Sequence, residues 1–204
     1  MLVSAELRWF WRNALPDGVD AWFRQGSIPA GGGTSRSDEY LVDTRQTELG
    51  LKKRGGGAGV EIKGLVAVRG RAPAPFDGAI QIWSKWTSHV LTIDRLPRVV
   101  VHKTRWVRKF DTSGPRLTEI ELDENERPRD ANVEPPERGC QVEIVALRLD
   151  SGEAWGSVGF EAFGDLATVE DSVQRTAAHL AATISGFPRG LELSYPAWLA
   201  AHVA

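Results

Sequence analysis

Charged residues stand two apart in several segments that otherwise have the composition of β-strands. The segment VSAELRWFW, residues 3–11, places Glu6 and Arg8 on one side of a strand and large apolar residues on the other. Side chains two residues apart share a face of a strand, so each such pair predicts a strand with one charged and one apolar face. The spacing recurs in four further pairs: Lys52 and Arg54, Glu61 and Lys63, Lys103 and Arg105, and Glu119 and Glu121.

These charged faces have two interpretations. In an antiparallel sheet packed on a core, such a face lies in solvent, and for any single pair this is the more frequent case. Recurrence over most of the strands favours a closed barrel, whose charged faces line a common interior while helices and a long loop cover the apolar faces. Basic side chains from several strands would repel one another in that interior unless an anion lay there, and guanidinium and ammonium groups suit phosphate oxygens. We therefore expect an α+β fold, an antiparallel β-barrel or tunnel with a polar lumen.

The rest of the chain supplies further strands and two helical covers. A strand is expected at 3–12, and strand composition returns later, in residues 38–45, 47–54, 60–68, 98–110, 116–124, 139–150 and 154–163. Pro16 and Asp17 predict the start of a short helix. From Asp165 an apolar stripe runs at helical spacing to Ile184, which predicts a long amphipathic helix near the C-terminus.

Three further segments are assigned from their composition and spacing. Apolar residues three and four apart predict a helix over 76–90. Glycine and serine predict a mobile loop at about 29–38, and charge and proline predict another at about 124–139.

Composition limits the class of protein. The 204 residues, 42% of them hydrophobic, suit one domain over 1–204, and a net charge of −2 gives no general attraction to nucleic acid or anionic membranes. The single cysteine, Cys140, excludes an internal disulfide framework. The sequence has no apolar run of the roughly 20 residues that span a membrane, and its start lacks the pattern of a cleavable signal. We expect a soluble, cytoplasmic protein with no nucleic-acid or membrane partner; the oligomeric state is left open.

The order of several short motifs resembles the CYTH family, the triphosphate tunnel metalloenzymes. These motifs are YLVDTR, LGLKKRGG, VEIK and HKTR, followed by an acidic strand near residue 161, the amphipathic helix and a closing LSYPAWL. The family includes class IV adenylyl cyclases, thiamine triphosphatases and inorganic triphosphatases. The resemblance covers nearly the whole chain and implies a tunnel fold that binds a triphosphate.

The resemblance also implies a set of site residues. The family's first strand carries E-x-E-x-K, which falls here on Ser4, Glu6 and Arg8, so the first acid is missing and arginine replaces lysine. A later E-x-E likewise retains only its second acid, Glu161, because Gly159 holds the first position. Glu6 and Glu161 are therefore the expected ligands of one Mg²⁺ or Mn²⁺ ion, with phosphates completing its shell. The expected phosphate-binding residues are Arg8, Lys52, Arg54, Lys63, Lys103 and Arg105. Glu61 and Glu143 either compensate for the lost acids or form ion pairs with tunnel bases.

Two functions follow from these residues. In the first, the protein is a diverged metal-dependent phosphohydrolase or cyclase that acts on inorganic triphosphate or on a small molecule containing a triphosphate. In the second, it is a non-catalytic module that keeps the basic tunnel, binds a small phosphorylated anion and has lost the metal site. Whether the protein is an enzyme is left open at this stage.

Overall fold

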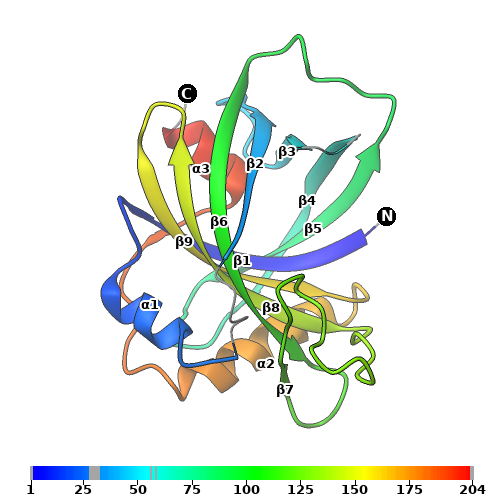
Figure 1. Ribbon diagram of the computed structural model, residues 1–204, viewed down its shortest axis with the longest axis vertical. Coiled ribbons are helices and arrows are strands. Elements are labelled where there is room, and N and C mark those ends of the chain that lie inside the picture. Colours follow the sequence, from blue (N-terminus) through cyan, green and yellow to red (C-terminus); the bar gives the residue numbers. More distant parts are fainter. Residues whose placement is uncertain (1, 28–32, 56, 58, 203–204) are drawn as a thin grey trace.

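Eight strands form a closed antiparallel barrel in the computed structural model, which describes residues 2–27, 33–55, 57 and 59–202 (Figure 1). Going round the barrel, the strands are β1, β5, β4, β3, β2, β6, β8 and β9, and β9 pairs with β1 to close it. Their bounds are β1 Leu2–Arg12, β2 Thr34–Leu41, β3 Leu49–Arg54, β4 Val60–Arg71, β5 Ala79–Ser88, β6 Arg98–Asp111, β8 Gly139–Leu149 and β9 Ala154–Phe163. Two short strands lie beside it: β7 (Thr118–Ile120) pairs with β6, and β10 (Leu191–Glu192) pairs with β1.

Both faces of β1 are buried. Its residues from Ser4 to Phe10 are all inaccessible to solvent or nearly so, although Glu6 and Arg8 are charged. The apolar side chains Leu7 and Trp9 pack in the outer core, and the charged side chains point into the barrel. The expected barrel with a polar lumen is thus confirmed, and the alternative of charged strand faces in bulk solvent is wrong for this strand.

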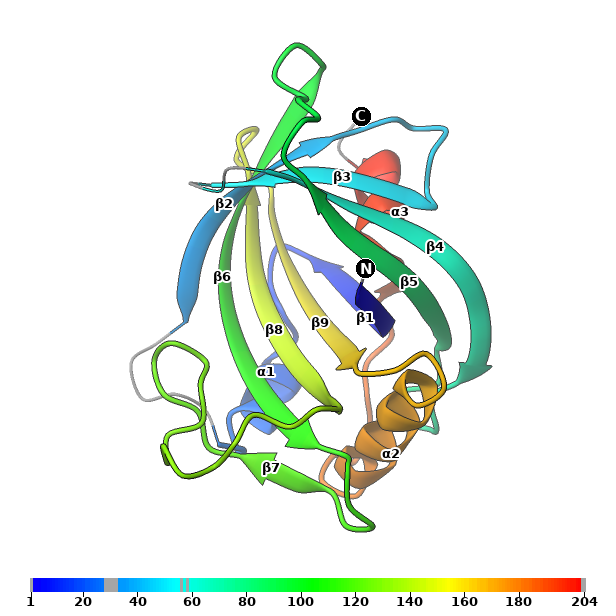
Figure 2. The ribbon, with the colours of Figure 1, turned by 90° about the vertical axis from the view of Figure 1, so that its right-hand side faces the viewer.

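Two helices cover the outer apolar face at one end of the barrel. These are α1 (Asp17–Phe23) and α2 (Val169–Ala181), which lie together in the lower part of both views (Figures 1 and 2). The buried side chains Val173, Ala177 and Leu180 of α2 share one core with the outer faces of β1, β8 and β9. The expected short helix after Pro16 and the amphipathic helix after Asp165 are both present.

A third helix, α3 (Tyr195–His202), lies at the opposite end of the barrel (Figure 2). Its Trp198 is fully buried and stacks on Phe10 of β1, with ring centroids 4.8 Å apart and planes inclined by 4°. Tyr195 stacks in the same way on Tyr40 of β2. An aromatic cluster therefore fills this end of the barrel.

The helix expected over 76–90 is wrong, because the segment contains strand β5. Ile80 and Ile82 pack in the outer core, whereas Trp83 faces the lumen, with the Lys63 ammonium 4.4 Å above its ring. Large apolar residues on both faces remove the two-residue alternation of a half-exposed strand. The remaining spacing happened to match that of a helix.

The loop expected at 29–38 is also partly wrong. Residues 34–38 belong to β2 and pair in register with β6. Residues 28–32 lie outside the described part of the chain. The glycine and serine residues of this stretch predicted a loop, but Arg36 and Asp38 face the lumen, where they pair with each other.

The segment 124–139 contains no helix or strand before Gly139, which begins β8. The Asp123 carboxylate accepts hydrogen bonds from the backbone N–H groups of Asn125 and Arg127, and the Asp130 carboxylate does the same for Asn132. The candidate strand at 116–124 forms only the short β7. The loop returns to β6, where the backbone carbonyl of Glu126 accepts a hydrogen bond from Lys109 and its carboxylate accepts one from Arg105.

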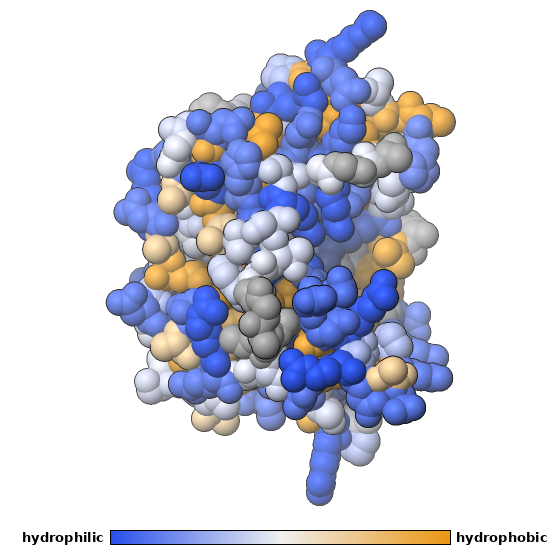
Figure 3. All heavy atoms as spheres, viewed as in Figure 1, coloured by the Kyte–Doolittle hydropathy of each residue, from blue (hydrophilic) through white to orange (hydrophobic). Residues whose placement is uncertain are grey.

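The surface carries mainly hydrophilic residues on the face drawn in Figure 3, with hydrophobic residues in small separate groups. Among the described residues, the helices are too short or too polar for any of them to cross a membrane.

Candidate functional site

The barrel lumen holds a cavity of about 630 Å³, and all eight sequence-predicted site residues line it. Alternation along each strand explains this convergence, since every second residue of a barrel strand faces the interior. Eight basic side chains and four acidic ones line the cavity. The bases are Arg8, Arg36, Lys52, Arg54, Lys63, Lys85, Lys103 and Arg105, and the acids are Glu6, Glu61, Glu143 and Glu161.

The first group of charges joins β1, β4, β5 and β9. Lys63 donates to one oxygen of Glu6, and Lys85 lies 2.7 Å from the other oxygen. Lys85 also donates to Glu161. The Ser4 hydroxyl donates to Glu6 over 2.9 Å. Burial alone would raise the pKa of Glu6, but the two lysines hold that pKa far below its ordinary value.

The second group lies around Glu143 of β8. Arg8 donates to this carboxylate and, over 3.1 Å, to the Ser157 hydroxyl, while Arg105 approaches the other carboxylate oxygen at 3.3 Å. Although burial opposes it, the charges of Arg8 and Arg105 lower the pKa of Glu143 to about 2. Arg105 also donates to Glu126, which belongs to the loop before β8.

The third group lies around Asp38 of β2. This carboxylate is completely buried and has three bases near it: Lys103 at 3.1 Å, and Arg36 and Lys52 each at 3.3 Å. Glu61 is shared in the same way, at 3.0 Å from both Lys52 and Arg54. Glu6, Glu61, Glu143 and Asp38 therefore each pair with more than one base, and Glu161 pairs with Lys85.

The lumen carries more positive than negative charge. The bases outnumber the acids even when Asp38 and Glu126, which do not line the cavity, are included. Burial and the charge of Lys85 lower the pKa of Lys63 to about 8. Burial and the charge of Lys52 lower the pKa of Lys103 well below its ordinary value. A bound anion would relieve this repulsion.

Three charged residues that face the lumen were missed from the sequence. Arg36 and Asp38 have the same two-residue spacing as the predicted pairs, but they lay in a segment expected to be a loop. Lys85 lay in the segment expected to be a helix. The spacing of charges alone could have indicated Arg36 and Asp38. Lys85 gave no such signal, because the residue two positions before it is the aromatic Trp83 and not a charged residue.

Glu119 and Glu121, the last of the five predicted pairs, do not face the lumen. Glu119 of β7 accepts two hydrogen bonds from Arg108, on the side of β6 that packs against Phe23 of α1. Glu121 is exposed and lies near Arg129. The solvent-face interpretation of paired charges is therefore correct for Glu121, whereas Glu119 is only 20% exposed and pairs with the buried Arg108 outside the barrel.

The expected metal ligands do not fit a divalent cation in this arrangement. Glu6 and Glu161 do lie together, as directly paired residues of β1 and β9, but the Lys85 ammonium lies between their carboxylates. The other Glu6 oxygen is taken by Lys63. Within the described ranges, no three His, Cys, Asp or Glu side chains are grouped so that they could hold a metal ion.

Ser4 and Gly159 stand where the family resemblance led us to expect acids, and the surroundings of these two positions differ. Ser4 lies beside Glu6 and bonds to it, as expected of a lumen position. Gly159 also faces the lumen, but a Cβ there would lie 2.5 Å from Nη2 and 2.6 Å from Cζ of Arg8. The arginine side chain therefore occupies the space that an acid at residue 159 would need.

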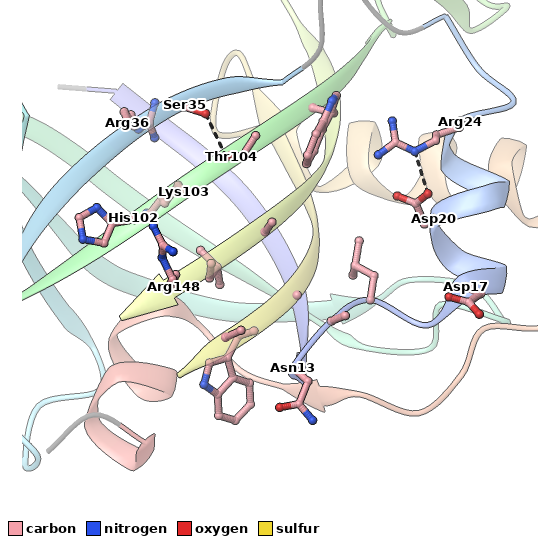
Figure 4. Close-up of a pocket in the computed structure, with 18 of the residues that line it drawn as sticks. Asn13, Asp17, Asp20, Arg24, Ser35, Arg36, His102, Lys103, Thr104 and Arg148 are labelled. Atoms are coloured by element: carbon pink, nitrogen blue, oxygen red, sulfur yellow. Dashed lines mark hydrogen bonds and ion pairs between the residues drawn. The ribbon is translucent and has the colours of Figure 1, made fainter. Parts of the chain in front are cut away.

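A second hollow, of about 900 Å³, lies outside the barrel between α1 and the strands β2, β6, β8 and β9 (Figure 4). Asp20 and Arg24 pair with each other there at 2.7 Å, and Ser35 and Thr104 are 3.0 Å apart. Of the predicted site residues only Lys103 lines this hollow. Because its charges do not converge as those of the lumen do, we take the lumen as the candidate site.

Comparison with known proteins gives similarities to solved structures at low sequence identity. No family model matches the chain, and no curated protein matches it. Similar solved structures include the PH1012 protein of Pyrococcus horikoshii OT3, with 10% identity, 92% of each chain covered and a TM-score of 0.41. They also include a conserved hypothetical protein of Pyrococcus furiosus, with 10% identity, 87% of this chain and 90% of that chain covered and a TM-score of 0.37. The Pct1 RNA triphosphatase of S. pombe has 12% identity, 89% and 77% coverage and a TM-score of 0.42.

Proposed function

We propose that the lumen binds a small phosphorylated anion whose recognised part is a linear oligophosphate, such as a triphosphate group. The observation that carries this proposal is the convergence of eight bases and only four acids on one cavity. Buried charges are stable only when they are paired, and here Glu6, Glu61 and Glu143 are each shared by two bases. An oligophosphate supplies several negative charges along a line, which suits bases distributed along the strands of a barrel.

The chemistry of the donors supports phosphate in particular. Arg8, Arg36, Arg54 and Arg105 offer planar forks of N–H groups, and the lysines offer compact charges. Both kinds of donor form strong charge-assisted hydrogen bonds with phosphate oxygens. The family resemblance of the sequence points to the same class of ligand.

Of the two functions expected from the sequence, the contacts of the acids favour the binding module. Phosphoryl transfer needs positioning and neutralisation of charge, and a metal-dependent enzyme needs carboxylates that are open to the metal. Glu6 and Glu161 are instead engaged by lysines. We therefore propose binding without a metal-dependent reaction, and the cytoplasmic location expected from the sequence stays part of the proposal.

Thermal unfolding with sodium tripolyphosphate tests this function. At a hundredfold excess over the dissociation constant, binding to the folded state adds about 2.7 kcal/mol to the free energy of unfolding. For a chain of this size, this raises Tm by roughly 5 to 10 °C. Sodium sulfate at equal ionic strength is the control and should give a much smaller shift. Equal shifts with both salts, or none in low salt, would refute the proposal.

A second assay separates binding from catalysis. Purified protein is incubated with tripolyphosphate, ATP or thiamine triphosphate, each with and without Mg²⁺ or Mn²⁺, and released phosphate is measured. The binding module is expected to release none above the level without protein. Metal-dependent release that is lost in a Glu6→Gln variant would support the phosphohydrolase instead.

A further inference from the structure

Lys85 lies where the sequence led us to expect a metal ion. Its ammonium contacts Glu6 at 2.7 Å and also Glu161, so that it joins the two carboxylates across β1. Its side chain lines the cavity and is 27% exposed, so it faces the space available to a ligand as well as the two acids.

A divalent cation in a phosphate site has two tasks: it bridges carboxylates to phosphate oxygens and it reduces the negative charge between them. An ammonium group has three N–H donors and one positive charge. Two of the Lys85 donors have carboxylate partners among the described residues, which leaves a third for an oxygen in the cavity. Lys85 is thus equipped for the same two tasks.

The surroundings keep Lys85 in place and charged. The attraction of Glu6 and Glu161 outweighs burial and raises the pKa of the ammonium above its ordinary value. On β4, the neighbouring residue directly opposite is Lys63, whose ammonium holds the other oxygen of Glu6. A cation that approached Glu6 would therefore meet two positive charges first.

We infer that the Lys85 ammonium takes the place of a divalent cation in this lumen, so that oligophosphate binds without metal and Glu6 and Glu161 serve to position Lys85. This inference rests on the proposed function, because it concerns how the same anion is held. It makes Lys85 a ligand-binding residue and the two acids positioning residues.

The decisive experiment is calorimetric titration with tripolyphosphate, in chelator and in Mn²⁺, of the wild type and of Lys85→Ala. The wild type should bind at least as tightly in chelator as in Mn²⁺. Lys85→Ala should bind about tenfold or more weakly in chelator, the scale of one lost hydrogen bond to a charged group. Mn²⁺ should restore its affinity, because removal of the ammonium opens Glu6 and Glu161 to the metal.

Two further variants serve as a control and as a second test. Lys53→Ala removes a lysine from the same barrel that pairs with Asp94 outside the lumen, and it should match the wild type in both buffers. Lys85→Gln keeps most of the side chain without its charge, so it should also lose affinity in chelator. It provides the same test if Lys85→Ala fails to fold. Direct titration with Mn²⁺ alone should give binding to Lys85→Ala and none to the wild type.

The possible failures are distinguishable. Wild-type binding of tripolyphosphate that requires Mn²⁺ would overturn the role of Lys85 and leave the proposed anion site intact. Unchanged affinity of both Lys85 variants in chelator would likewise overturn the role of Lys85 and leave the proposed anion site intact. An absence of wild-type binding in either buffer would refute the proposed function itself.

Discussion

Arg8 reaches Glu143 by crossing over Gly159. In the barrel, β9 lies between β1 and β8, and Gly159 is the residue directly opposite both Arg8 and Glu143. The absence of a side chain at residue 159 opens a path for the guanidinium to pass over β9 and donate to the carboxylate. The position at which the resembled family carries an acid is thus used here to join two strands that do not pair with each other.

We expect Gly159→Ala to destabilise the fold. The added methyl group would lie 2.5 Å from the Arg8 guanidinium, so Arg8 must move away from Glu143 or the strands must shift. Crowding of a packed site costs about 1–3 kcal/mol of the free energy of unfolding, measured by urea titration. Gly64→Ala in β4 is the control, because a Cβ there meets nothing within 4 Å. Similar losses in both variants would contradict this account.

Glu143→Gln should cost roughly 3–5 kcal/mol of the free energy of unfolding, because it leaves the buried Arg8 without its counter-ion. The Arg8 and Glu143 side chains are 7% and 6% exposed. The double variant Arg8→Met, Glu143→Gln should lose much less than the sum of the single variants. Urea titration of all four proteins measures the coupling. Additive losses would show that the two residues act separately.

Glu143 also predicts a response to acid. Its pKa is about 2 in the folded protein, lowered by Arg8 and Arg105 against the effect of burial. A lowered carboxyl pKa adds stability that is fully present above the unfolded pKa of about 4.3 and is lost as the pH falls towards 2. The difference in free energy of unfolding between wild type and Glu143→Gln should therefore shrink over this range. A constant difference from pH 6 to pH 2.5 would contradict the assignment.

The affinity for tripolyphosphate should decrease as the pH rises above about 8. Burial and the neighbouring Lys85 lower the pKa of Lys63 to about 8 in the free protein, and a bound anion raises that pKa again. Binding above pH 8 must therefore add a proton to Lys63, which weakens the apparent affinity by up to about tenfold per pH unit. Lys63→Arg stays charged, so its affinity should decline less between pH 7.5 and 9.5. Parallel declines would exclude Lys63 as the titrating group.

Arg54→Ala should weaken tripolyphosphate binding by about tenfold without a loss of stability. Arg54 lines the cavity and is 46% exposed, so we take the lower end of the range for hydrogen bonds to charged groups. Arg12→Ala is the matched control, because Arg12 is an exposed β-strand arginine that pairs with Glu153 outside the lumen. Calorimetric titration should distinguish the two variants. Equal affinity for both would place Arg54 outside the binding site.

The barrel could be predicted from the sequence because its signal is local. Glu6 and Arg8 share a strand face through their two-residue spacing alone, and the same argument applies to Lys52 with Arg54. The lumen is the structure in which most of these faces meet. The signal failed for Glu119 and Glu121, since a short strand added beside β6 has the same local pattern as a barrel strand.

The contacts within the lumen could not be predicted in the same way. The meeting of Lys85 with Glu6 and Glu161 depends on the register between strands that are distant in sequence. Nor does any local pattern indicate that Asp38 gathers bases from three strands. Family resemblance placed Glu6 and Glu161 next to each other, but it assigned a metal ion to the space that a lysine fills.

The stacked rings of Tyr40 and Tyr195, packed on Phe10 and Trp198, close one end of the lumen. Leu2 and Arg54, both well exposed, also line the cavity, so a linear phosphate chain would enter beside them and stop against the tyrosine rings. Each added phosphate would gain contacts with bases only until the chain reaches these rings, and any further phosphate would remain in water. The barrel would then act as a gauge of chain length, with affinity rising along the series of linear phosphates and levelling off.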